Sequence, residues 1–63
     1  MTPFTPHNIF QFKDRQVSVR HGYLTLRLYG DGWLVRYTPD EGVPVSIEGA
    51  DVFSACRFAN DRI

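Results

Sequence analysis

Few side chains in this sequence have the types and spacing for acid–base, nucleophilic or metal chemistry. Cys56 is the only cysteine, and His7 and His21 are the only histidines. A thiolate at Cys56 would be a nucleophile, but these three residues lack the ligand spacing of the common metal sites. Asp40 and Glu41 are adjacent carboxylates of the kind that serve acid–base catalysis, yet they lie in a turn-forming segment, where solvated acids are ordinary.

The same residue types have simpler interpretations. Cys56 falls on the apolar side of an expected helix, which is typical of a small buried hydrophobic side chain. Gly30 and Gly32 are not followed by the helix and the Lys-Ser or Lys-Thr pair that a phosphate-binding loop needs, so we interpret them as hairpin glycines. We therefore expect no catalytic residue, no metal site and no cofactor, and we expect that the protein is not an enzyme.

The composition limits the classes of partner and the cellular location. The chain has 63 residues, of which 43% are hydrophobic, and its formal net charge is zero. This size predicts one folded domain of modest stability, without the long-range field that draws proteins to nucleic acid or to anionic membranes. No apolar stretch approaches the roughly 20 residues that span a bilayer, and a single cysteine forms no internal disulfide. We expect a cytoplasmic protein without a membrane partner.

Alternating apolar residues predict the elements that position the side chains. Residues 1–8 contain two prolines and no periodicity, which predicts an extended N-terminal arm, and residues 9–63 form the domain. Several segments of the domain have apolar residues at every second position, so that these residues share one face of a strand. The segments are marked by Phe10 and Phe12; by Val17 and Val19; by Leu24, Leu26 and Leu28; and by Trp33, Val35 and Tyr37.

Two turn sequences predict how these strands pair, because the length of a hairpin loop fixes which residues lie opposite one another. Asp31-Gly32 is typical of a two-residue type I′ turn, and in that register Arg27 lies opposite Arg36. His21-Gly22 is a second two-residue candidate. Both turns bring the apolar faces of neighbouring strands together, so they predict an antiparallel meander.

The C-terminal half of the chain changes from strand to helix periodicity. Residues 43–47 alternate after a turn, and Pro44 marks this short last strand as a sheet edge because proline cannot donate to a ladder. Beyond Gly49 the apolar spacing becomes that of one helical face, and Asp51 is in position to cap the helix. The apolar helical face consists of Val52, Ala55, Cys56, Ala59 and Ile63.

The predicted fold is α+β, a small antiparallel β-meander of four to five strands with one C-terminal α-helix packed on one face. A small half-open β-barrel is the alternative for the same strands. In this prediction Phe10, Leu26, Val35 and Cys56 contribute to the core. In both folds one face of the sheet stays in contact with water, which antiparallel sheets tolerate.

The exposed face is the one surface whose composition indicates a function. It combines arginine, tyrosine and leucine, a mixture that interfaces use. The predicted opposition of Arg27 and Arg36 is mildly unfavourable in the isolated domain, and a bound partner would relieve it. The alternative is an ordinary solvated face whose arginines are neutralised by Asp14, Glu41 or Glu48. The predicted partner-binding residues are Arg20, Tyr23, Arg27, Tyr29, Leu34 and Arg36.

We therefore expect a small non-enzymatic protein-binding module, of the kind that mobile elements and phages encode to inhibit or redirect a larger host protein. Neutral net charge and the mixed surface favour a protein partner. A regulatory nucleic-acid-binding protein is the first alternative, with single strands stacking on Tyr23 and Tyr29. A structural homo-oligomer, such as a homodimer, is the second alternative, because a domain this small gains core by pairing with its own copy.

Overall fold

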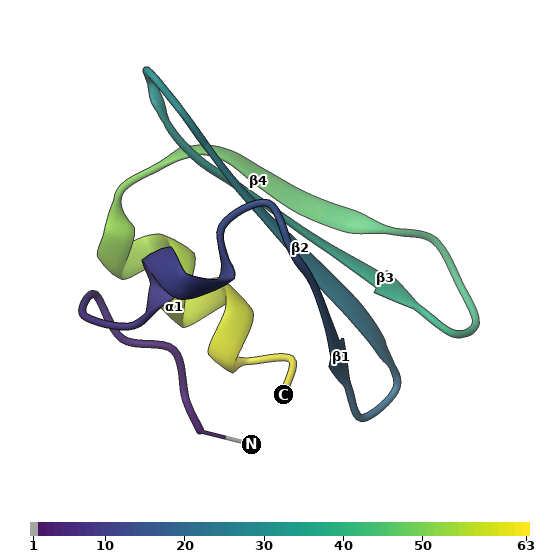
Figure 1. Ribbon diagram of the computed structural model, residues 1–63. Coiled ribbons are helices and arrows are strands. Elements are labelled where there is room, and N and C mark those ends of the chain that lie inside the picture. The colour runs from purple at the N-terminus through teal and green to yellow at the C-terminus, as the bar shows by residue number, and fades with distance from the viewer. Residues whose placement is uncertain (1) are drawn as a thin grey trace.

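A computed structural model describes residues 2–63, which form a four-stranded antiparallel sheet with one α-helix on one of its faces (Figure 1). The strand order is β1-β2-β3-β4, so that consecutive strands are neighbours and β1 and β4 are the edges. This open sheet confirms the α+β meander over the half-open barrel. The elements are the 3-10 helix η1 (Ile9–Phe12), β1 (Gln16–Val19), β2 (Gly22–Tyr29), β3 (Gly32–Pro39), β4 (Val45–Ala50) and α1 (Val52–Asn60).

The strand predicted around Phe10 and Phe12 is wrong, because this segment forms η1. Two phenylalanines at alternate positions fit a helical turn as well as a strand. In η1 it is Ile9 that is fully buried, whereas Phe10 is 53% exposed. Phe10 makes an edge-to-face contact with Trp33, with ring centroids 5.3 Å apart. The prediction that Phe10 contributes to the core is therefore wrong.

The central hairpin of β2 and β3 has its apolar side chains on one face, as predicted, but in a different register. Leu26 lies opposite Val35 and Arg27 lies opposite Leu34, so that residues 30–31 form the loop. The loop thus lies one residue earlier than predicted. Each residue of β2 therefore faces a residue of β3 that is two positions earlier than the predicted one. Because strand side chains alternate with period two, this displacement leaves each side chain on its predicted face.

Gly22 and Gly32, which were predicted to lie in turns, are the first residues of β2 and β3, where a neighbouring strand packs closely against each of them. Gly32 has a φ of 134°, and a Cβ there would lie 2.7 Å from the backbone carbon of Gly49 in β4. Only glycine accommodates both this conformation and this approach. A Cβ on Gly22 would likewise collide with the backbone of Thr38 in β3. The loop between β1 and β2 is accordingly Arg20-His21 and not His21-Gly22.

The last strand and the helix have different boundaries from the predicted ones. β4 begins at Val45 and ends at Ala50, so Pro44 precedes this edge strand and does not lie within it. The helix ends at Asn60. Ile63 is therefore not on its apolar face but packs against the core from beyond the helix.

Hydrogen bonds satisfy backbone groups at both ends of α1. The Asp51 carboxylate accepts a hydrogen bond from the backbone N of Ser54 at 2.7 Å, which confirms the predicted cap. This bond holds the pKa of the Asp51 carboxyl below its ordinary value, because it stabilises the charged form. At the other end, Arg62 donates to the carbonyl of Phe58 at 2.8 Å, and its guanidinium lies 3.6 Å from the centroid of the Phe58 ring.

A side-chain amide in α1 holds the N-terminal segment against the helix. Asn60 accepts a hydrogen bond from the backbone N of Phe4 at 2.7 Å and donates one to the Phe4 carbonyl at 2.9 Å. This amide clamp satisfies the backbone of Phe4 while its ring is buried. The ring packs edge-to-face against Phe12, with centroids 5.1 Å apart. Phe4 lies in the segment expected to be an extended arm, so that segment contributes to the core.

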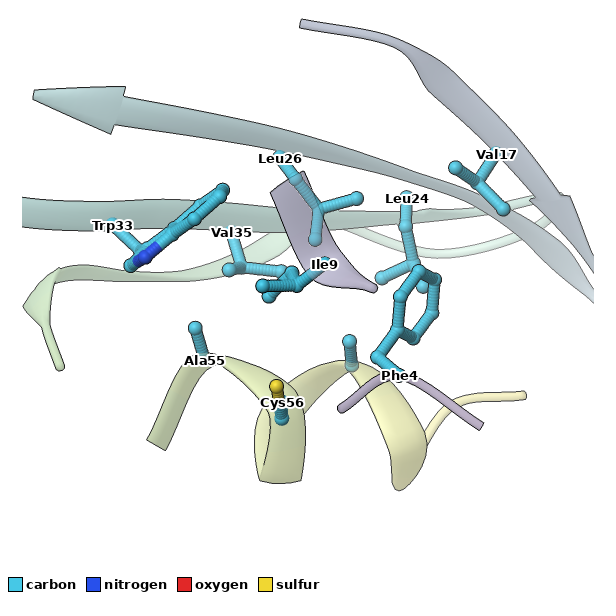
Figure 2. Close-up of a cluster of buried hydrophobic side chains, with 10 residues drawn as sticks. Phe4, Ile9, Val17, Leu24, Leu26, Trp33, Val35, Ala55 and Cys56 are labelled. Atoms are coloured by element: carbon cyan, nitrogen blue, oxygen red, sulfur yellow. The ribbon is translucent and has the colours of Figure 1, made fainter. Parts of the chain in front are cut away.

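The core lies between the sheet and a cover made of α1, η1 and the N-terminal segment. Figure 2 shows Leu24, Leu26 and Val35 pointing from the sheet toward the helix, with Phe4 and Ile9 between the two layers. No element of residues 2–63 covers the opposite face of the sheet (Figure 1), which is called the outer face below. The buried apolar residues are Phe4, Ile9, Val17, Leu24, Leu26, Trp33, Val35, Ala55, Cys56 and Ala59.

Replacing Leu26 with alanine is expected to lower the free energy of unfolding by about 2 to 5 kcal/mol, because a fully buried side chain leaves a cavity. The matched control is Leu28→Ala in the same strand, where the side chain is 40% exposed; this change should cost less than about 1 kcal/mol. Urea denaturation followed by circular dichroism measures both variants. A loss below about 1 kcal/mol for Leu26→Ala would show that this face is not the core.

Replacing Asn60 with alanine is expected to destabilise the fold by about 1 to 3 kcal/mol, since the N–H and C=O of Phe4 then lose their partner in a part-buried position. Asn8→Ala is the control, because the bonds of this amide to Thr5 and Pro3 are exposed to solvent. Thermal unfolding compares the two. Equal effects of the two substitutions would contradict a special role for the amide clamp.

Candidate functional site

The outer face carries most of the residues predicted to bind a partner. Period-two alternation sends the neighbours of the buried leucines in β2 and of Val35 in β3 to this side of the sheet. A shallow hollow of about 350 Å³ lies there. Arg20 is not part of it, because it lies exposed in the loop between β1 and β2. The hollow is lined by Tyr23, Thr25, Arg27, Tyr29, Leu34, Arg36 and Thr38, and it is called the arginine hollow below.

The two central strands hold all of the lining residues. β2 pairs with β1 and β3, and β3 pairs with β2 and β4, so both strands have hydrogen-bonded neighbours on each side. Tyr23 and Leu34 are half-buried, whereas Arg27 and Arg36 are exposed, and Tyr29 is 53% exposed. The sheet thus presents charged and aromatic groups to solvent on a rigid support, and no loop has to become ordered before they can bind.

The predicted opposition of Arg27 and Arg36 is wrong. Arg27 lies opposite Leu34, while Arg36 lies opposite Thr25 in β2 and Ser46 in β4. The displaced register makes the arginines diagonal neighbours, for which the typical separation is about 7–8 Å. Their mutual repulsion is therefore weaker than predicted. The residues directly opposite both arginines are neutral, so the cross-strand pairs leave the positive charge over the hollow uncompensated.

Two acidic residues beside the arginine hollow were not among the predicted site residues. Asp31 and Glu48 line a second hollow of about 290 Å³ together with Gly49, which is called the acidic hollow below. Tyr29 and Leu34 line both hollows, so the two are contiguous. Glu48 was expected only as an acid that neutralises the arginines, and it lies on the outer face because it follows Ile47, which pairs with the buried Val35 before the register of β4 shifts.

A third hollow, of about 440 Å³, lies where the β1–β2 loop meets the end of β3. Its lining includes His21 and the adjacent acids Asp40 and Glu41. The carbonyl of His21 accepts hydrogen bonds from the Tyr37 hydroxyl at 3.1 Å and from the backbone N of Asp40 at 2.8 Å. These bonds tie the loop to the end of β3 through the His21 carbonyl, and they leave the His21 ring and the two carboxylates out.

Cys56 is a free cysteine on the face of α1 that packs against the sheet, and it is 6% exposed (Figure 2). Burial raises the pKa of its thiol, because a low-dielectric surrounding disfavours the thiolate. This is the opposite of what activates a nucleophilic cysteine.

Within residues 2–63, no group of three or more His, Cys, Asp or Glu side chains could hold a metal ion. None of the described helices is long and apolar enough to cross a membrane.

The arginine hollow is suited to binding. Guanidinium groups bind carboxylates through paired hydrogen bonds, and tyrosine offers an apolar ring with a polar tip. The lining contains no carboxylate, histidine or cysteine, which are frequent general bases and nucleophiles.

In comparisons with known proteins, no family model, curated protein or solved structure matches the chain. No relative therefore indicates which ligand this chain binds.

Native Cys56 is expected to react with iodoacetamide about tenfold or more slowly than in urea, because burial blocks access and raises the thiol pKa. Because the folded state favours the neutral thiol, Cys56 contributes to the free energy of unfolding. This contribution is fully present below the ordinary thiol pKa and is lost as the pH rises through the raised pKa of the folded state. Cys56→Ala should remove this alkaline loss. Mass spectrometry of the alkylated protein over time measures the rate, and equal native and urea rates would contradict the burial.

Proposed function

We propose that this chain is a small, non-enzymatic protein-binding module that uses the outer face of its sheet. The observation that carries the proposal is the arginine hollow on the two central strands. Tyrosine and arginine are enriched among the residues that dominate binding energy at protein interfaces. Leu34 adds a half-buried apolar contact between them. An interface core of this kind is apolar and aromatic, with arginine as its favoured charged residue.

The proposed partner is a larger host protein that presents acidic side chains to Arg27 and Arg36. Carboxylates match the planar guanidinium group, which binds them in a bidentate manner. By covering such a surface, the module would inhibit its partner or redirect it as an adaptor, in the way of small proteins encoded by mobile elements or phages. We propose that it acts in the cytoplasm, where a free thiol such as Cys56 stays reduced.

Two features favour a protein partner over nucleic acid. Tyr23 and Tyr29 are six positions apart on β2, which corresponds to about 20 Å at about 3.4 Å per residue. Rings this far apart do not stack on neighbouring bases of one strand, as single-strand binding surfaces do. Asp31 and Glu48 in the acidic hollow would also repel a continuous phosphate backbone, whereas a protein can place carboxylates over the arginines and neutral or basic groups over these two acids.

The test is capture from a nuclease-treated lysate of the native host, with the tagged wild type, the double variant Arg27→Gln/Arg36→Thr and the control Arg20→Gln. The wild type and the control should retain the same stoichiometric protein, because Arg20 lies outside the arginine hollow. The double variant should bind at least about tenfold more weakly, a loss of about 1.4 kcal/mol or more.

Two further measurements make this result interpretable. Thermal melts should show a folded double variant, since both positions are exposed. Surface plasmon resonance with the captured protein should show faster dissociation, because desolvated charge contacts act mainly on the off-rate. A double variant that binds as tightly as the wild type would exclude the outer face as the contact surface. Material retained from an untreated lysate and lost entirely after nuclease treatment would instead support a nucleic-acid partner.

A further inference from the structure

The outer face has a charge polarity that an acidic partner surface alone does not match. Arg27 and Arg36 lie in one hollow, and Asp31 and Glu48 lie in the adjoining one. A uniformly acidic partner would attract the arginines and repel the two carboxylates. The whole outer face is complementary to a surface that places acidic groups over the arginine hollow and basic groups over the acidic hollow.

We propose that a second copy of the chain supplies this surface, so that the protein forms a two-fold symmetric dimer through its outer face. In a two-fold interface the same patch is used by both copies, and residue i of one meets residue j of the other while j meets i. An axis in the plane of the interface, running between the two hollows, places the arginine hollow of each copy over the acidic hollow of the other. A uniformly basic face would repel its copy, whereas this face is self-complementary.

The residues at the boundary of the two hollows supply the apolar contact. Tyr29 and Leu34 line both hollows, so they lie close to the proposed axis. In the monomer the side chain of Tyr29 is 53% exposed. Against its symmetry mate it would bury aromatic surface and keep its hydroxyl group at the edge. Apolar contact at the axis and opposite charges on both sides of it therefore arise from one arrangement.

The size of the face favours a weak and reversible dimer. Four strands about 4.8 Å apart, with eight residues rising about 3.4 Å each, give a face of at most about 20 Å by 27 Å. Two copies would then bury on the order of 1,000 Å² in total, which is the lower limit for a specific interface. We expect a dissociation constant on the order of 100 μM.

This dimer would cover the same residues that the proposed function assigns to a host protein, and in that respect the inference rests on the proposed function. The two complexes exclude each other, because one face cannot contact both partners. Self-association would thus protect the binding face while the module is free. A host protein that binds more tightly than the second copy would then dissociate the dimer.

Charge-reversal variants studied by sedimentation velocity test the arrangement. Between about 10 μM and about 1 mM, the wild type should change from monomer to dimer, and added salt should weaken the dimer. Arg36→Glu and Glu48→Arg should each stay monomeric, because each places like charges across the interface. Their equimolar mixture should form dimers again, since each variant supplies the charge that the other lacks. Arg20→Glu makes the same charge change outside both hollows, so it should dimerise like the wild type.

Three results would each overturn the dimer: a wild type that stays monomeric, single variants that dimerise like the wild type, or a mixture that stays monomeric. If Arg36→Glu lacks a native circular dichroism spectrum, Arg27→Glu takes its place in the mixture. The lysate experiment separates the two proposals. A monomeric wild type whose double arginine variant loses the host protein overturns only the dimer. A dimer restored in the mixture, together with a double arginine variant that keeps the host protein, overturns only the proposed function.

Discussion

The period-two alternation of β2 and β3 is the constraint on which the rest of the structure depends. Leu24, Leu26 and Val35 are fully buried on one face. A slip of one residue in either strand would turn Arg27 or Arg36 into the core, where an unpaired charge is strongly unfavourable. The core thus fixes which residues face solvent. The candidate site consists of the residues of β2 and β3 whose side chains point to the opposite, outer face.

A chain of 63 residues has little material to cover both sides of a sheet. Here α1, η1 and the N-terminal segment all pack on the inner face (Figure 1). Ala55 and Ala59 are fully buried, and their small side chains let the helix lie close to the strands. The amide clamp of Asn60 then fixes the N-terminal segment beside the helix. The outer face is left with its arginines, tyrosines and carboxylates, which is why a partner is sought there.

The sequence allowed prediction of which residues share a face, but not of which residues are neighbours on it. Residues 30–32 all favour turns, so a two-residue loop fits in two positions, and the close packing of β4 on Gly32 favours the observed one. Such long-range contacts leave no local pattern, and neither does the amide clamp, which joins positions 56 apart. The predicted opposition of Arg27 and Arg36 failed for this reason. Both arginines stayed on the predicted face because the displacement was by two residues.

The most direct test of the account is residue-resolved NMR of the isotope-labelled protein, with and without the captured host protein. Binding through the outer face predicts that the amide signals of Thr25, Leu34 and Arg36 shift or broaden in the complex. The signals of Ala55 and Arg57 in α1, on the other side of the sheet, should stay unchanged. Changes confined to α1 and the N-terminal segment, with the signals of β2 and β3 unaffected, would contradict the account.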